Sequence, residues 1–167
     1  MLEVSELLNN LETELKQTLV ARRVVDPLMI GIRTGGVWIA EIMHARLAIN
    51  EPLGLLDSSF YRDDFAQIGV HANVKPSHLP TNMEGRDIIL IDDVFCTGRT
   101  IRAALNEIFD YGRPHQVILA ALIERGGKQI PITPDCVGTR MTLQAEQRIK
   151  LINPPLSIVL EPTGHQR

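Results

Sequence analysis

The segment 88–100 constrains the fold of this chain more than any other part of the sequence. Four consecutive aliphatic residues run into two adjacent carboxylates, Asp92 and Asp93, and a Thr97-Gly98 turn then leads into a helical pattern. The apolar run is typical of a strand buried on both faces, as in a parallel sheet. The acids can accept hydrogen bonds from sugar hydroxyls, and backbone N–H groups at a helix N-terminus favour a phosphate. The segment therefore predicts a strand, a loop and a helix that together suit a ribose 5-phosphate.

Strands and helices alternate along the rest of the chain. Leucines recur at helical spacing in the opening segment, and this helix is expected to end near Arg22-Arg23. Gly112 is expected to take a left-handed conformation after the helix of the main motif. We predict helices at 4–23, 37–47 and 99–111, strands at 28–32, 53–60, 87–94 and 116–123, and shorter strands near 135–137 and 156–160.

This alternation predicts parallel β-α-β units and an α/β fold, with a mainly parallel central sheet flanked by helices. We expect residues 1–167 to form a single domain. In such folds ligands bind at the carboxyl ends of the strands, which is where Asp92 and Asp93 fall. Residues 61–82 lack a regular pattern, and a loop of that length in a compact domain is usually functional or mobile.

Composition and charge argue against several other classes of protein. The net charge of −3 and the 4% aromatic content are unlike a protein built mainly to grip nucleic-acid backbones or to stack unpaired bases. Cys96 and Cys136 have no CxxC spacing, and the histidines show no metal-ligand spacing, so we expect neither a zinc site nor a disulfide framework. We also expect no membrane span and no signal peptide, which favours a cytoplasmic protein.

The segment that contains Asp92 and Asp93 allows other interpretations. A Walker GxxxxGK[ST] loop and a dinucleotide-binding GxGxxG are both absent. Acids at the end of a strand can simply be solvated, and glycines between a strand and a helix, as in Gly31–Gly36, are common turn residues. The hydroxyls, arginine and glycine of residues 96–100 come two residues after the acids. They favour the binding of a sugar whose two neighbouring hydroxyls must be held.

These residues resemble the signature of the type I phosphoribosyltransferases: four apolar residues, Asp-Asp, three variable residues and Thr-Gly-Arg/Lys-Thr. The resemblance implies the type I phosphoribosyltransferase fold with a flexible hood loop. It implies phosphoribosyl pyrophosphate (PRPP) as a substrate, with Mg²⁺ carried on its diphosphate and no metal held directly by the protein. It assigns the ribose 2′- and 3′-hydroxyls to Asp92 and Asp93. The residues it assigns to the 5-phosphate are Val94, Phe95, Cys96, Thr97, Gly98, Arg99 and Thr100.

The resemblance also assigns the pyrophosphate of PRPP to the segment Arg33-Thr34-Gly35-Gly36. Arg33 supplies a positive charge that suits a diphosphate. The related pattern in the family reads Thr-Arg-Gly, so Gly35 stands where an arginine is expected. This departure removes one expected contact to the pyrophosphate.

Further blocks resemble the PyrR-type members of this family, which combine uracil phosphoribosyltransferase activity with regulation of a pyrimidine biosynthesis operon. The block 56–64 resembles the start of their hood loop, and 112–114 is typical of the end of their main helix. The block 122–126 is also typical, together with 130–132 and 137–138. Each block also has a plainer reading, either as a charged solvated loop or as a strand end followed by a turn.

The PyrR-type resemblance assigns roles to two more groups of residues. Tyr61 and Arg62 are expected to act in the hood loop, where Arg62 neutralises the departing phosphates while the closing loop excludes water. Ile123, Glu124 and Arg125 are expected to form the pocket that reads the edge of the pyrimidine. Together with the acids and Arg33, the hood residues make up the expected catalytic set.

The same resemblance implies regulation through an mRNA leader stem-loop, bound by a basic face of a homodimer or higher homo-oligomer. Cations that stand at or near the expected positions are Lys128 and Arg140, and Arg22 and Arg23 are further candidates. The alternative is that these are scattered solvated charges. Several other expected cations are absent and the chain is acidic, which predicts weak RNA contact.

The favoured function is transfer of the 5-phosphoribosyl group from PRPP to N1 of uracil, giving UMP and pyrophosphate, with regulation by UMP or UTP. A second hypothesis is a UMP- or UTP-sensing regulator with little catalysis, which Gly35 favours. A third is a purine salvage phosphoribosyltransferase. Purine relatives usually carry an aspartate at the place of Cys96, and a thiol cannot hydrogen-bond a purine N7 in that way, which favours a pyrimidine. Cys96 could equally be a small buried filler.

Overall fold

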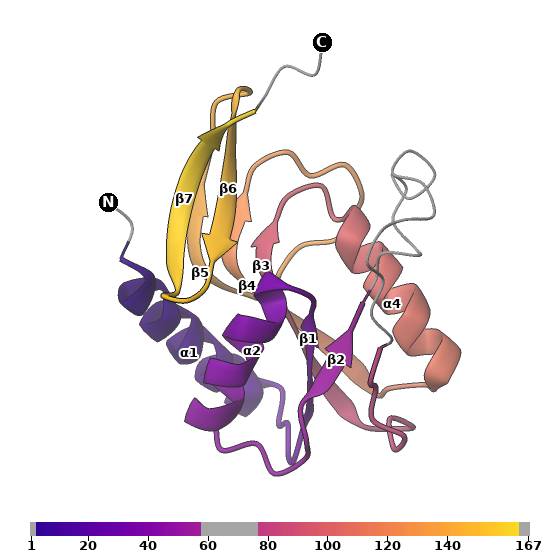
Figure 1. The fold of residues 1–167 in the computed structure, drawn as a ribbon. Helices are drawn as coiled ribbons and strands as arrows, with labels where there is room; N and C mark the ends of the chain where they lie inside the picture. Colours follow the sequence, from indigo (N-terminus) through magenta and orange to yellow (C-terminus); the bar gives the residue numbers. More distant parts are fainter. Residues whose placement is uncertain (1–2, 58–76, 164–167) are drawn as a thin grey trace.

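Five parallel strands form the central sheet in a computed structural model, which describes residues 3–57 and 77–163. In the order in which they lie side by side, the strands are β2 (Gly54–Leu56), β1 (Leu28–Ile32), β3 (Asp87–Phe95), β4 (Gln116–Arg125) and β5 (Cys136–Met141) (Figure 1). The predicted α/β fold with a parallel central sheet is confirmed. The strand order reverses between β1 and β3, and this is the point at which open sheets of this kind bind ligands.

Helices cover both faces of the sheet (Figure 1). α1 (Val4–Ala21) and α2 (Gly35–Arg46) belong to the core on one face, and α4 (Arg99–Tyr111) belongs to the core on the other. Along β3, Ile89 and Ile91 enter the first core while their neighbours enter the second. Burial on both faces explains the unbroken aliphatic run that preceded the acids in the sequence.

Two predicted helix boundaries are wrong. α2 begins at Gly35 and not at Val37, so both glycines lie in its first turn. Gly112 has a φ of 172° and is therefore extended, not left-handed. The chain leaves α4 in an extended conformation because Arg113, the next residue, forms hydrogen bonds with the loop that precedes β3. Its N–H donates to Oε2 of Glu84 at 2.9 Å, and its carbonyl accepts the N–H of Gly85 at 2.8 Å.

The strand predictions also need correction. β2 ends at Leu56, earlier than the predicted 53–60, and the described residues are interrupted from residue 58 to 76. β5 runs beyond the predicted 135–137 to Met141. The prediction missed β6 (Gln147–Ile152), which forms a separate antiparallel hairpin with β7 (Ser157–Pro162). A period-2 alternation of apolar and polar residues was present in β6, but the segment is short and charged.

α1 lies directly against β5. The N–H of Val137 donates to Oε2 of Glu14 on the helix at 2.8 Å, and Asn10 donates to the carbonyl of Gly138 at 3.3 Å. A Cβ on Gly138 would lie 2.5 Å from the carbonyl oxygen of Leu122 and 2.7 Å from that of Leu7. Only a glycine fits between these two backbones. In residues 3–57 and 77–163, none of the helices is long and apolar enough to cross a bilayer.

The contact at Gly138 predicts a large effect of a single methyl group. Gly138→Ala should lower the free energy of unfolding by about 1–3 kcal/mol, because the rigid backbones of α1 and β4 must move apart. Gly126→Ala is the matched control, since its Cβ would meet nothing closer than 3.9 Å. Urea denaturation at equal protein concentration measures both. Equal stability of the two variants would contradict this description of the packing.

Candidate functional site

The two predicted acids lie at the carboxyl end of β3, beside the end of β1. The parallel register pairs Gly31 with Ile91, so the residues after each of them are also neighbours. Asp92 is buried, with 5% of its surface exposed, and its Oδ1 accepts the N–H of Asp93 at 3.0 Å. Asp93 is half-buried. The reading of both acids as a solvated strand end is therefore wrong for Asp92, whose carboxylate is held against the backbone of Asp93.

The predicted pyrophosphate loop, residues 33–36, packs against these acids. A Cβ on Gly36 would lie 2.7 Å from the carbonyl oxygen of Ile91, and one on Gly35 would lie 2.1 Å from Oδ2 of Asp93. On the other side, the N–H of Arg33 donates to the carbonyl of Leu56 in β2 at 2.9 Å. The structure thus brings together the two motifs that are separated by more than fifty residues in sequence.

The predicted phosphate loop connects β3 to the first turn of α4. Gly98 has a φ of 91°, a left-handed conformation that favours glycine, and a Cβ there would also lie 2.8 Å from Ile130. The Thr97 hydroxyl accepts the N–H of Arg99 at 3.1 Å, and the Thr97 carbonyl accepts that of Gln129 at 3.0 Å. The first N–H groups of a helix have no acceptor within it, so this end of α4 can receive an anion.

The predicted base-binding residues end β4, next to the phosphate loop. Ile123 is buried, and Glu124 pairs in register with Phe95. Cys96 is half-buried, and its thiol donates to the carbonyl of Gly126 at 3.6 Å. A Cβ on Gly127, whose φ is 118°, would lie 3.4 Å from the Cys96 sulfur. Cys96 therefore borders the turn after β4 and is not a core filler.

Arg125 is half-buried at the end of the same strand, and Thr100 is half-buried in the first turn of α4. Val94 is half-buried on β3. Tyr61 and Arg62 lie outside the described residues, so their expected catalytic roles stay predictions. Residues 56–64 are described only as far as Asp57.

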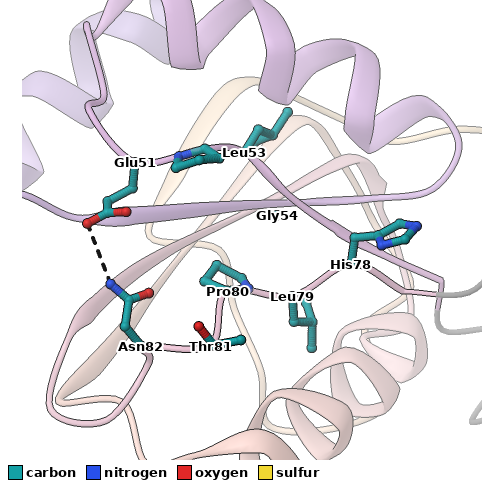
Figure 2. A pocket seen from close by; sticks show the side chains of 9 residues that line it. Glu51, Leu53, Gly54, His78, Leu79, Pro80, Thr81 and Asn82 are labelled. Atoms are coloured by element: carbon teal, nitrogen blue, oxygen red, sulfur yellow. Dashed lines mark hydrogen bonds between the residues drawn. The ribbon is translucent and has the colours of Figure 1, made fainter.

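Two pockets differ in their relation to the predicted site residues. One, of about 460 Å³, is formed at the pyrophosphate loop by Arg33, Thr34, Val37, Trp38, Glu41, Asp57 and Asn153. A second, of about 490 Å³, runs between Glu51–Gly54 and His78–Asn82 and contains none of the predicted site residues (Figure 2). A hydrogen bond of 3.5 Å between Asn82 and Glu51 closes one end of it.

The predicted RNA-binding cations do not form one cluster. Arg22 pairs with Asp135 just before β5, whereas Arg140 lies near the other end of that strand and pairs with Glu124 at 2.8 Å. Lys128 donates to the hydroxyl of Thr133 at 3.0 Å. Arg23 is exposed at the end of α1. Two of the four cations thus already have a carboxylate partner.

Sequence reasoning gave no role to two buried acids, one directly after β2 and one on α4. Asp57 is 8% exposed and Glu107 is 6% exposed. Asp57 follows the apolar residues of a strand, as Asp92 does, so its position along the chain was an available signal. Glu107 stands among the apolar residues of the buried face of α4, where an acid interrupts the helical pattern. Burial raises the pKa of the Glu107 carboxyl, a hydrogen bond from Ser77 lowers it, and the nearby Asp57 and Asp110 raise it.

The two glycines of the pyrophosphate loop should respond differently to a methyl group. Gly36→Ala should lower the free energy of unfolding by about 1–3 kcal/mol, because its Cβ meets the backbone of β3. Gly35→Ala should cost less, because its Cβ meets the Asp93 side chain, which can rotate. Urea denaturation of both variants checks this order. A Gly35 variant less stable than the Gly36 variant would refute the packing of this loop.

Comparisons with known proteins agree with this geometry. Residues 4–147 match the family model of the phosphoribosyl transferase domain. The bifunctional protein PyrR of Pseudomonas fluorescens is 50% identical over 158 residues, which cover 94% of each chain. That of Pseudomonas entomophila is 48% identical over 155 residues, covering 92% of this chain and 90% of the relative.

Solved structures show the same fold at low identity. A hypoxanthine-guanine phosphoribosyltransferase from Bacillus anthracis has a TM-score of 0.66 at 14% identity, covering 84% of this chain and 82% of its own. A purine phosphoribosyltransferase from Pyrococcus horikoshii has a TM-score of 0.61 at 20% identity, covering 90% and 92%. These two likenesses speak for the fold alone. The matched family model and the relatives of nearly equal length show that this chain belongs to the phosphoribosyl transferase family, as a relative of the bifunctional PyrR proteins.

Proposed function

We propose that this chain transfers the 5-phosphoribosyl group from PRPP to N1 of uracil, giving UMP and pyrophosphate, and that it regulates pyrimidine biosynthesis genes in response to UMP or UTP. The observation that carries the proposal is the contact between Asp93 and the pyrophosphate loop. This contact lies between β1 and β3, where the strand order of the sheet reverses. Likeness over nearly the whole chain to bifunctional PyrR proteins supports uracil over a purine. We place the activity in the cytoplasm, in a homodimer or higher homo-oligomer.

Two parts of the site bind different parts of PRPP. Asp92 and Asp93 accept hydrogen bonds from the 2′- and 3′-hydroxyls of the ribose. The N-terminus of α4, with the hydroxyls of Thr97 and Thr100, receives the 5-phosphate. Because these groups are fixed by β3 and the helix that follows it, the sugar is oriented before reaction. Orientation of this kind is a large source of rate enhancement.

The pyrophosphate leaves from the loop at residues 33–36, where Arg33 balances part of its charge. The C1′–O bond breaks as the N1–C1′ bond forms, its electron pair leaves with the pyrophosphate, and the N1 proton of uracil passes to solvent. Fixed positive charge and backbone N–H groups stabilise the developing diphosphate. Mg²⁺ carried on PRPP supplies further neutralisation of that charge.

The residues proposed to bind the base lie at the end of the neighbouring strand, β4. Ile123, Glu124 and Arg125 end β4 beside the phosphate loop, and Cys96 closes the turn that follows. A base placed there lies on the far side of Asp93 from the pyrophosphate loop. This geometry suits an attack on C1′ from the side opposite the leaving group.

An assay with labelled bases tests the catalytic proposal. With PRPP and Mg²⁺, uracil should be converted to UMP. Asp93→Asn should lower kcat/KM for PRPP about 10- to 100-fold, because it removes a charged hydrogen-bond acceptor for the sugar. Its unfolding free energy should change by less than about 0.5 kcal/mol. Glu6→Gln, an exposed change on α1, is the control and should leave both quantities unchanged.

The outcomes separate the rival functions. Turnover of guanine or hypoxanthine without uracil would establish purine salvage instead. Binding of UMP without turnover of any base would make the chain a nucleotide sensor, as the glycine at position 35 allows. Normal turnover by the Asp93 variant would remove the sugar-binding role of that residue.

A salt titration tests the RNA part of the proposal. With UMP present, the chain should bind the leader stem-loop of its own pyrimidine operon, with a shallow dependence on salt because few cations are clustered. Lys128→Ala and Arg140→Ala should each reduce the salt slope by about 1. Lys16→Ala on α1, whose ammonium pairs with Glu12, should leave the slope unchanged. No binding at low salt would mean that regulation acts through another partner.

A further inference from the structure

The segment that follows β4 lies against the phosphate loop. The N–H of Gln129 donates to the carbonyl oxygen of Thr97 at 3.0 Å. The side chain of Gln129 reaches the first residue of α4, since its Oε1 accepts the Nε–H of Arg99 at 3.0 Å. Ile130, the next residue, leaves no room for a Cβ on Gly98. One glutamine therefore holds both ends of the turn that begins the helix.

The hydrogen bond to Thr97 sets the direction of one peptide group in this turn. The Thr97–Gly98 peptide is trans, so its carbonyl oxygen and its N–H point in opposite directions. Because the carbonyl is directed at Gln129, the N–H of Gly98 is directed away from the segment that follows β4. Gly98 is the N-cap of α4, and its N–H belongs to the groups that have no acceptor within the helix. It is therefore one of the N–H groups that can donate to the 5-phosphate proposed for this loop.

The same peptide group is the part of the loop that can reverse most easily. Gly98 has a φ of 91°, and glycine tolerates both signs of φ, so the local sequence alone does not fix the orientation of the peptide before it. A reversed peptide would direct the N–H of Gly98 toward Gln129 and the carbonyl oxygen of Thr97 into the phosphate site. The partial negative charge of that oxygen would then repel the phosphate. Binding of the anion therefore depends on the hydrogen bond that holds this peptide in place.

We propose that Gln129 is a positioning residue for the 5-phosphate of PRPP and of UMP. Its main-chain N–H holds the Thr97–Gly98 peptide in the orientation that suits an anion, and Arg99 holds its side chain, so each hydrogen bond supports the other. Gln129 acts through the loop and does not itself contact the phosphate. This inference rests on the proposed function, because it takes residues 97–100 as the site of the 5-phosphate. It adds a role for a residue outside the Asp-Asp and Thr-Gly-Arg-Thr motif.

Binding of two ligands that differ only in the phosphate isolates this role. UMP carries the 5-phosphate and uridine lacks it, so the ratio of their dissociation constants, measured by isothermal titration calorimetry, reports on the phosphate loop. Gln129→Ala should weaken UMP binding about three- to tenfold, because Arg99 loses its acceptor and residue 129 loses its anchor. Uridine binding should stay unchanged. Gln17→Ala, which alters an exposed glutamine on α1, is the matched control and should change neither dissociation constant.

Further variants separate positioning from a general disturbance of the loop. Gln129→Glu keeps an oxygen acceptor for Arg99 and should bind UMP within about twofold of the unmodified protein. Arg99→Ala removes the other partner, so adding Gln129→Ala to it should weaken UMP binding no further. In NMR spectra of the unmodified protein, the Gly98 amide proton should shift downfield when UMP binds, and the amide of residue 129 should exchange slowly. Gln129→Ala should reduce this shift and speed the exchange.

Three results would overturn the proposal. They are an equal weakening of UMP and uridine binding in Gln129→Ala, UMP binding by Gln129→Ala that equals that of the unmodified protein, and UMP binding by Gln129→Glu that is as weak as that of Gln129→Ala. The second result, together with a lower midpoint of urea unfolding, would leave Gln129 with a purely structural role. If the unmodified protein binds UMP no more tightly than uridine, the phosphate site of the proposed function itself fails, which is a different result from UMP binding that is insensitive to Gln129.

Discussion

The close approach of α2 to the end of β3 is the constraint on which the rest of the site depends. Parallel pairing of β1 with β3 places the two strand ends side by side, and Gly36 lets the helix begin against the carbonyl of Ile91. Because α2 begins so close to β3, Asp93 reaches the backbone at Gly35. The sugar-binding acids and the pyrophosphate loop, which are distant in sequence, become parts of one surface because two glycines lack side chains.

Four carboxylates gather at this edge of the sheet, although its expected substrate is also negative. Asp57, Asp92, Asp93 and Glu124 follow or end three of the five strands. Arg33 lies among them, and Arg140 is already paired with Glu124. A polyanion can bind here because backbone N–H groups and the metal that it carries offset its charge. The same distribution explains why the chain offers little for a long run of RNA phosphates.

Much of this could be predicted from sequence, for identifiable reasons. The aliphatic run of β3 is buried on both faces, so its pattern was unambiguous, and Asp92 followed it directly. The hairpin of β6 and β7 was half missed because two short, charged strands give a weak periodic signal. Gly112 was mispredicted because the next residue, Arg113, donates its N–H to Glu84, which lies far away in sequence, and this bond sets the direction of the chain.

The structure of the chain with UMP bound tests the central claim most directly. The account predicts that both ribose hydroxyls lie within hydrogen-bonding distance of Asp92 and Asp93, with the 5-phosphate on the backbone N–H groups of residues 97–100 at the start of α4. A nucleotide bound in the pocket along the outer edge of β2 (Figure 2), with the start of α4 empty, would contradict it.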